Sequence, residues 1–312
     1  MKYALFLGCK IPSGLPAYAT STRAVLGHLG IELVDLEFQC CGYPARNYDR
    51  EAFVVAAIRN LALAERHALD VFTPCMCCFG TLRHAIGMMT EDAELRTRVS
   101  RSLAEVGLVW SGRATVQHVL PLLAREVGVD ALQAAVRAPR TDLRLAAQYG
   151  CHALRPSDVT GIDNPVAPTI FETLIRAAGA TPVDWPRRLD CCGDPSHEAN
   201  APLSGRMTRA KIVDAQESGA DAICTACPHC HLRFDAAQAA APAPAMRTLL
   251  VTQLLGVAMG LPAPSLGLRH RAAVGPTRWW PPPGQSRAAV GPTTWCPGPR
   301  SQSRAAVGPT TS

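Results

Sequence analysis

The sequence predicts an α/β protein with two duplicated half-domains, each a small parallel sheet flanked by helices, and a disordered C-terminal tail. Short apolar segments alternate with segments of helical periodicity, as in parallel sheets with crossover helices. The same order of segments and cysteines occurs twice, which indicates internal duplication. After residue 261 the composition changes to a low-complexity repeat. We therefore divide the chain into half-domains at 1–142 and 143–261 and a tail at 262–312.

The first half-domain begins with an apolar strand at residues 3–8, which ends at Gly8 and delivers Cys9. Further strands are expected at 31–36, 71–73 and 116–118. Helical spacing of apolar residues predicts helices at 21–30, 49–69, 91–106 and 120–127, and one more after Cys78. Strands therefore alternate with helices in this half, and the helix at 91–106 is an addition to that order.

The second half-domain repeats this order. A strand at 145–150 leads to Cys151, and strands follow at 182–185 and 221–224. Helices are expected at 167–178 and 202–218. Residues 249–256 occupy the place of 116–123, and the second half lacks a counterpart of the helix at 91–106.

Composition excludes some classes of function. The chain has 312 residues, of which 48% are hydrophobic, so it can bury a substantial core. The net charge of +6 arises from six arginines after residue 260, where no acidic residue occurs. A neutral body gives no nucleic-acid footprint, and no apolar run is long enough to be a transmembrane segment.

The redox compartment follows from the cysteines. The residues before Cys9 are too few for a secretory signal, so we expect a cytoplasmic protein. Thiols stay reduced there, and the 13 cysteines are then metal or redox ligands rather than a disulfide framework. The tail repeats RAAVGPT from Arg271, Arg287 and Arg304, and its Cys296 is expected to be incidental.

Ten cysteines form a pattern that occurs twice. A lone cysteine is followed after 30 or 39 residues by Cys-Cys-Gly, and after a further 33 or 34 residues by CxxC. The ten are Cys9, Cys40, Cys41, Cys75 and Cys78, then Cys151, Cys191, Cys192, Cys227 and Cys230.

A thiolate-rich site selects an iron–sulfur cluster, zinc or Cu(I). An ordinary cubane cluster or a structural zinc uses four thiolates, whereas each half offers five. The fifth thiol is therefore an extra ligand to an unusual cluster, a redox-active thiol, or a bystander. Gly42 and Gly193 suit sharp turns beside the paired cysteines. Each CxxC is expected at a helix start, where backbone amides stabilise thiolates, and Pro228 suits such a position.

Other candidates are weaker. Cys77 and Cys224 fall outside the repeated pattern and are expected to pack behind the sites or in the core. His229 and His231 flank Cys230 and could carry protons or lie on a helix surface. His152 and His197 follow predicted ligands and could serve the sites or have purely structural roles. His118 is expected in the core.

The doubled cysteine pattern resembles the CCG-domain family. Segments at 3–12, 30–44, 59–65 and 251–260 resemble specifically the B subunit of CoB–CoM heterodisulfide reductase, and the likeness covers about residues 1–261. The resemblance implies two noncubane [4Fe-4S] clusters, one per half, each held by the five cysteines of that half. The alternative is one [4Fe-4S] cluster and one zinc ion.

The resemblance also implies a function. A small-molecule disulfide would be reduced to two thiols between the clusters, within a multi-subunit complex. Electrons would come from a ferredoxin-like C subunit, which is fed by a flavin-containing A subunit. The alternative is a non-catalytic electron-transfer subunit of a CCG-containing dehydrogenase of the lactate, glycolate or succinate/fumarate type. A third hypothesis is a zinc-stabilised assembly protein.

Overall fold

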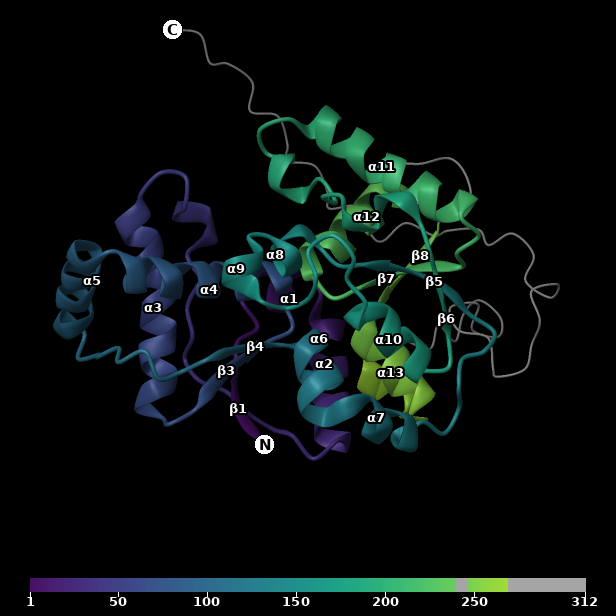
Figure 1. The fold of residues 1–312 in the computed structure, drawn as a ribbon, viewed down its shortest axis with the longest axis horizontal. Helices are drawn as coiled ribbons and strands as arrows, with labels where there is room; N and C mark the ends of the chain where they lie inside the picture. Colours follow the sequence, from purple (N-terminus) through teal and green to yellow (C-terminus); the bar gives the residue numbers. More distant parts are fainter. Residues whose placement is uncertain (240–245, 269–312) are drawn as a thin grey trace, which may run out of the picture.

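The computed structural model describes residues 1–239 and 246–268, and it has the α/β architecture that the sequence predicts (Figure 1). Two four-stranded sheets, both entirely parallel, are flanked by helices. The first sheet contains β1 (Lys2–Leu5), β2 (Glu32–Val34), β3 (Asp70–Thr73) and β4 (Val116–His118). The second contains β5 (Arg144–Gln148), β6 (Thr181–Val183), β7 (Ala222–Thr225) and β8 (Arg247–Leu250). Of the tail predicted for 262–312, residues 269–312 lie outside the described residues.

The two sheets have the same topology. Their strand orders are β2-β1-β3-β4 and β6-β5-β7-β8, so the first strand of each half pairs with the second and the third. In the last pair of each sheet, Thr73 faces His118 and Thr225 faces Leu250. The residues of β7 are all buried, as expected for a parallel strand covered on both faces. The internal duplication inferred from the cysteines therefore extends to the backbone.

The helices of the first half include the predicted extra one, now α5. They are α1 (Lys10–Gly14), α2 (Pro16–His28), α3 (Arg50–Arg66), α4 (Met76–Glu91), α5 (Ala93–Glu105), α6 (Val119–Pro121) and α7 (Val129–Ala135), with a 3-10 turn at Tyr43–Ala45. The helix predicted at 120–127 is instead α6 followed by a π-helical segment, Leu122–Gly128.

The second half contains fewer long helices. They are α8 (Cys151–Leu154), α9 (Ser157–Thr160), α10 (Ile170–Ala177), α11 (Ala201–Glu217), α12 (Pro228–Ala239) and α13 (Val251–Ala258), with 3-10 turns at Pro186–Leu189, Asp194–Ser196 and Ala263–Leu266. The longest helix of each half, α3 in the first and α11 in the second, begins at a side-chain cap. Asp49 accepts from the backbone N–H of Ala52 at 2.9 Å, and Asn200 accepts from that of Leu203 at 3.0 Å.

Helices from both halves meet between the sheets. α2 packs against α13, and α10 packs against α6, so each half contributes one partner to each pair (Figure 1). The sequence places residues 263–268 in the tail, and the structure corrects this assignment. The turn at Ala263–Leu266 packs on α2, and Leu266 is fully buried. A side chain at Gly256 of α13 would overlap Leu266, so the glycine permits this contact.

None of the helices within 1–239 and 246–268 combines the length and apolar character needed to cross a membrane.

Candidate functional site

The five cysteines of the first half lie where chain segments leave the carboxyl ends of its strands. Cys9 follows β1 and precedes α1, and Cys40 and Cys41 follow β2. Cys75 follows β3 and caps α4, whose first turn contains Cys78. Carboxyl ends of neighbouring parallel strands share one edge of a sheet, so the topology brings these cysteines together.

The second half repeats this placement. Cys151 follows β5 and begins α8, and Cys191 and Cys192 follow the turn after β6. Cys227 follows β7, and Cys230 lies in the first turn of α12. The structure thus gathers all ten predicted cysteines at the equivalent edges of two equivalent sheets.

Hydrogen bonds between thiols show how closely the first set converges. Cys41 accepts from the thiols of Cys40 and Cys78, and these bonds lower its pKa although burial opposes the shift. Donation to Cys41 raises the pKa of Cys40, with burial adding to the effect. The pKa of Cys78 is raised by its bonds to Cys41 and Cys75. The charge of Cys9 also raises the pKa of Cys40, which places that thiol nearby.

The second set forms a similar chain. Bonds from Cys151 and Cys192 lower the pKa of Cys191. The pKa of Cys227 is lowered by its bond from Cys230 and then by one from Cys75 of the first half. The two thiol networks therefore touch where Cys75 meets Cys227, a contact that the sequence did not predict.

The chemistry of this donor set fits a cationic, thiophilic group. Negative charges on neighbouring thiols oppose one another, so a few thiolates form only at the expense of raised pKa values around them. Bound iron would neutralise all of them. Among the described residues no three Cys, His, Asp or Glu side chains surround a point suited to a single metal ion. A cluster distributes its irons over a larger volume than a single ion, so it does not need three ligands around one point.

The backbone provides space and hydrogen bonds for sulfur. A Cβ on Gly8 would lie 2.6 Å from the Cys78 sulfur, so only glycine allows that approach. The Cys78 N–H donates to the Cys75 sulfur at 3.4 Å, as expected for a thiol at a helix start. The predicted turns at Gly42 and Gly193 are confirmed, with φ of 88° and 94°.

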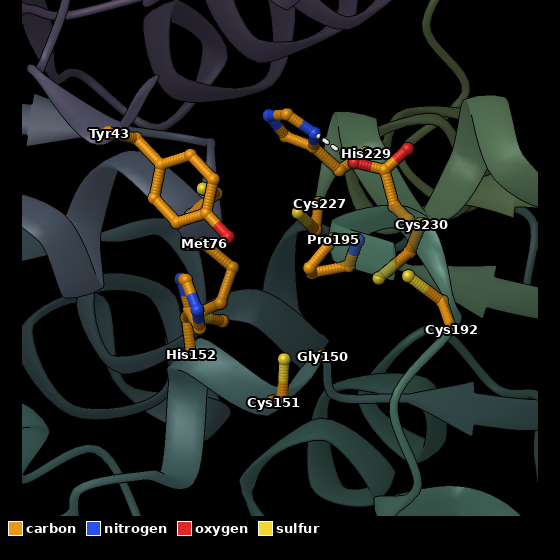
Figure 2. Close-up of a pocket in the computed structure, with 12 residues that line it drawn as sticks. Tyr43, Met76, Gly150, Cys151, His152, Cys192, Pro195, Cys227, His229 and Cys230 are labelled. Atoms are coloured by element: carbon orange, nitrogen blue, oxygen red, sulfur yellow. Dashed lines mark hydrogen bonds and ion pairs between the residues drawn. The ribbon is translucent and has the colours of Figure 1, made fainter. Parts of the chain in front are cut away.

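A half-open pocket lies between the two halves and is lined mainly by residues of the second half, which include four thiols of the second set (Figure 2). It contains about 350 Å³ of empty space, counting the part open to solvent. Figure 2 shows Tyr43, Met76 and His152 opposite Cys227, Cys192 and His229. The lining residues are Tyr43, Met76, Cys77, Gly150, Cys151, His152, Cys192, Asp194, Pro195, Cys227, His229 and Cys230.

Polar groups at this pocket are held by neighbours. His229 Nδ1 lies 2.6 Å from Asp194 Oδ2. Burial lowers the pKa of His229, but the Asp194 bond and the Cys227 charge outweigh it, so the net shift is upward. Burial raises the pKa of Tyr43 to about 12, which keeps its phenol protonated at neutral pH. The sequence did not predict a role for Asp194 or Tyr43, because neither belongs to a motif. Only the fold places them beside the thiols.

The remaining candidates separate into pocket and core. Cys77 lines the pocket, whereas Cys224 is fully buried within β7. His231 is buried, with its Nε2 3.3 Å from Asp235 Oδ2, and His197 is exposed.

His118 is in the core as predicted, but it also joins the halves. Its Nε2 lies 3.3 Å from the carbonyl oxygen of Pro74 and 3.2 Å from that of Ala226, the residues preceding Cys75 and Cys227. Sequence periodicity could not reveal this bridge, because the two carbonyls come together only in the folded chain.

Comparisons with known proteins agree with the geometry. The cysteine-rich domain called CCG matches residues 3–83 and 145–235. The B subunit of the ferredoxin:CoB-CoM heterodisulfide reductase of Methanosarcina mazei is 32% identical over 281 residues, 87% of this chain and 93% of that protein. A protein of Archaeoglobus profundus described as similar to the heterodisulfide reductase B subunit is 33% identical over 76% of this chain and 82% of its own length.

A relative with a different name is equally similar. The 8-methylmenaquinol:fumarate reductase membrane anchor subunit of Wolinella succinogenes is 34% identical over 86% of this chain and 96% of its own. The crystal structure of a hypothetical protein from Helicobacter pylori shares the fold, with a TM-score of 0.68 at 16% identity. It covers 86% of this chain, which spans 51% of that protein. The chain therefore belongs to the cysteine-rich CCG domain family and, within it, to the family of CoB–CoM heterodisulfide reductase B subunits.

Proposed function

We propose that this chain is the catalytic iron–sulfur component of a heterodisulfide reductase-like complex. It reduces a small-molecule disulfide, which takes up two electrons and two protons to give two thiols. The electrons come from a ferredoxin-like C subunit that receives them from a flavin-containing A subunit. The half-domains 1–142 and 143–261 each hold one noncubane [4Fe-4S] cluster.

Each cluster supplies one-electron transfer, and two such centres match one S–S bond. The ligands proposed for the first are Cys9, Cys40, Cys41, Cys75 and Cys78, and those for the second are Cys151, Cys191, Cys192, Cys227 and Cys230. The thiol contact between Cys75 and Cys227 supports two adjacent centres rather than two isolated ones.

The pocket is the observation that carries the catalytic assignment. Cys151, Cys192, Cys227 and Cys230 line it, so the second set of thiols is open to a small molecule. A centre that only relays electrons has no need of such an opening. The centre of a water molecule can occupy about 30 Å³ of the pocket, room for two or three waters. We therefore expect the S–S group of an extended substrate to enter, while the rest of the substrate stays outside.

The fumarate reductase relative supports a second candidate function, that of a non-catalytic electron-transfer subunit. A protein of that kind would transfer electrons without reducing a disulfide. Disulfide reduction by the purified chain with reduced methyl viologen as donor separates the two functions.

Metal analysis and a matched pair of variants test the proposal. Anaerobically purified protein should contain about eight irons, as two four-iron clusters require, and little zinc. It should oxidise reduced methyl viologen when given a panel of small disulfides that includes the CoB–CoM heterodisulfide. Cys192→Ser and Cys41→Ser should each lower the iron content and abolish disulfide reduction.

Cys224→Ala is the control, because Cys224 is equally buried but lies inside β7, away from both thiol networks. It should retain its iron. Full iron and activity in Cys192→Ser would refute the ligand assignment. One or two zinc ions in place of iron would support the zinc-stabilised alternative.

A further inference from the structure

The helix behind each Cys-Cys-Gly turn occupies the same place in both halves. α3 and α11 each have 17 residues and begin after a side-chain cap, Asp49 in one and Asn200 in the other. A Cβ on the glycine of the turn would lie 2.6 Å from the carbonyl oxygen of Phe53 in the first half. In the second half, a Cβ on the equivalent glycine would lie 2.8 Å from the carbonyl oxygen of Ser204. Phe53 and Ser204 each lie four residues after the cap, so the two helices can be compared position by position.

Asn60 and Lys211 then lie at equivalent positions, each 11 residues after its cap. Both side chains are buried and hold the loop that leads into Cys-Cys-Gly. Asn60 Nδ2 donates to the carbonyl oxygen of Cys40 at 3.1 Å. Lys211 Nζ donates to the carbonyl oxygen of Asp190 at 3.0 Å and to that of Arg187. The neutral side-chain amide of Asn60 in the first half thus corresponds to the basic amine of Lys211 in the second.

The Lys211 amine is enclosed beside the second thiol set. Its residue is 1% exposed, and Nζ lies 4.6 Å from the centre of the Trp185 ring. Burial lowers the pKa of Lys211 to about 8, against the opposing effect of nearby negative charges, so the amine is mainly protonated at neutral pH. The groups that oppose the shift are Cys230, Asp190, Cys192 and Cys191.

The surroundings add to this difference in charge. A half-open hollow next to Lys211, with about 480 Å³ of empty space counting the part open to solvent, is lined by Arg155, Arg187 and Asp190 as its other charged residues. Asp190 pairs with Arg187 at 3.1 Å, so the hollow keeps a positive balance. The loops that lead into Cys-Cys-Gly differ in the same direction, because residues 185–193 contain Arg187, Arg188 and Asp190, whereas residues 36–42 contain Glu37 and no basic residue.

We propose that Lys211 makes the second cysteine site the more oxidising of the two, so that electrons collect at the site that lines the pocket. This inference rests on the proposed function, because it assumes a redox centre in each half. Adding one electron to a centre adds one negative charge, and a buried cation stabilises that charge more strongly than solvent-exposed cations do. Net charge and hydrogen bonds around the sulfurs are among the features that set iron–sulfur potentials.

A potentiometric titration of the full-length, anaerobically purified protein, followed by EPR at fixed neutral pH, tests the inference. The wild type should show two midpoints. Lys211→Gln keeps a hydrogen-bond donor but removes the charge, and it should lower only the higher midpoint. We expect at least a tenfold fall in the ratio of reduced to oxidised second site at a given potential, which is about 59 mV for a one-electron couple. Lys211→Arg should keep the higher midpoint.

Thr208→Val is the matched control for loop support. Thr208 Oγ1 donates to the carbonyl oxygen of Cys192 at 2.8 Å, so this variant disturbs the same turn without changing charge. It should leave both midpoints in place. A shift as large as that of Lys211→Gln would show that loop geometry, not charge, sets the potential, and would overturn the inference.

Two further outcomes would also overturn it. A single midpoint for both sites in the wild type does so without any variant, even if Lys211→Gln fails to fold. So does a Lys211→Gln protein with normal iron content whose midpoints are both unchanged or both shifted equally. Protein that contains zinc instead of iron refutes the proposed function itself, and iron analysis distinguishes that failure from the others.

Discussion

At the scale of single residues, His118 has no counterpart in the second half. The strand register places Leu250 at the equivalent position. The Leu120 N–H lies 3.2 Å from His118 Nδ1, so Nδ1 accepts and the ring proton resides on Nε2. The Nε2–H group donates to the carbonyl oxygens of Pro74 in the first half and Ala226 in the second. One neutral imidazole thus satisfies two buried carbonyls across the boundary between the halves.

This arrangement predicts a dependence of stability on pH. Burial lowers the pKa of His118 to about 4, whereas the unfolded chain has a histidine pKa of about 6.5. Above about pH 6.5 both states are neutral, and below it only the unfolded state takes up the proton. As the pH is lowered from about 6.5 to about 4, the free energy of unfolding should therefore fall by up to about 1.4 kcal/mol per pH unit.

His118→Gln tests this prediction. The variant should lose about 1–3 kcal/mol at pH 7, because one carbonyl is left without a donor, but should lack this part of the pH dependence. Thermal unfolding midpoints of the two proteins at pH 7 and pH 5.5 provide the measurement. His197→Gln removes an exposed histidine and should behave as wild type. Equal pH slopes in wild type and His118→Gln would contradict the prediction.

The sequence was most informative about residues that repeat. Gly42 and Gly193 could be assigned positive φ from the turn that paired cysteines require, and each CxxC could be placed at a helix start. Nothing in the sequence distinguishes Lys211 from a lysine on a helix surface, because its burial depends on Trp185 and on a loop from another part of the chain. Asymmetry between the halves is a tertiary property, and a repeated pattern conceals it.

At the scale of elements, periodicity located most strands and helices, but their ends depended on packing. The helix predicted at 21–30 in fact begins at Pro16, since proline is accepted at the first helical position. The sequence assigns residues 263–268 to the tail because the chain beyond residue 261 is rich in proline, glycine and serine. The burial of Leu266 is decided by α2 and α13, which are distant in sequence from each other and meet only in the folded protein.

Leu266→Ala should therefore destabilise the protein. Leu266 is fully buried between α13 and α2, and truncation of such a leucine costs about 2–5 kcal/mol. The thermal midpoint should fall, while the iron content of the folded protein stays unchanged because both cysteine sites lie elsewhere. Pro264→Ala changes an exposed neighbour and should have little effect. An unaltered midpoint for Leu266→Ala would show that the turn at Ala263–Leu266 does not contribute to the core.

At the scale of the whole molecule, the two halves make the same kind of helix contact in both directions. α4 of the first half contacts α8 of the second, and α12 of the second contacts α1 of the first. Each of these contacts joins the helix that begins within a CxxC with the helix that begins at or directly after a lone cysteine. The packing therefore brings the two cysteine sites face to face, and the thiols of Cys75 and Cys227 meet at their boundary.

Adjacent sites should interact magnetically. If Cys75 and Cys227 each bind the redox centre of their own half, two unpaired spins lie close enough to broaden or split each other's EPR signals. The spectrum of wild-type protein with both sites paramagnetic should then differ from the sum of the spectra of Cys41→Ser and Cys192→Ser, each of which retains one site. Power saturation should also be easier in the variants, because an isolated spin relaxes more slowly. A wild-type spectrum equal to that sum would mean that the sites are magnetically independent, which would contradict the adjacency of the two redox centres.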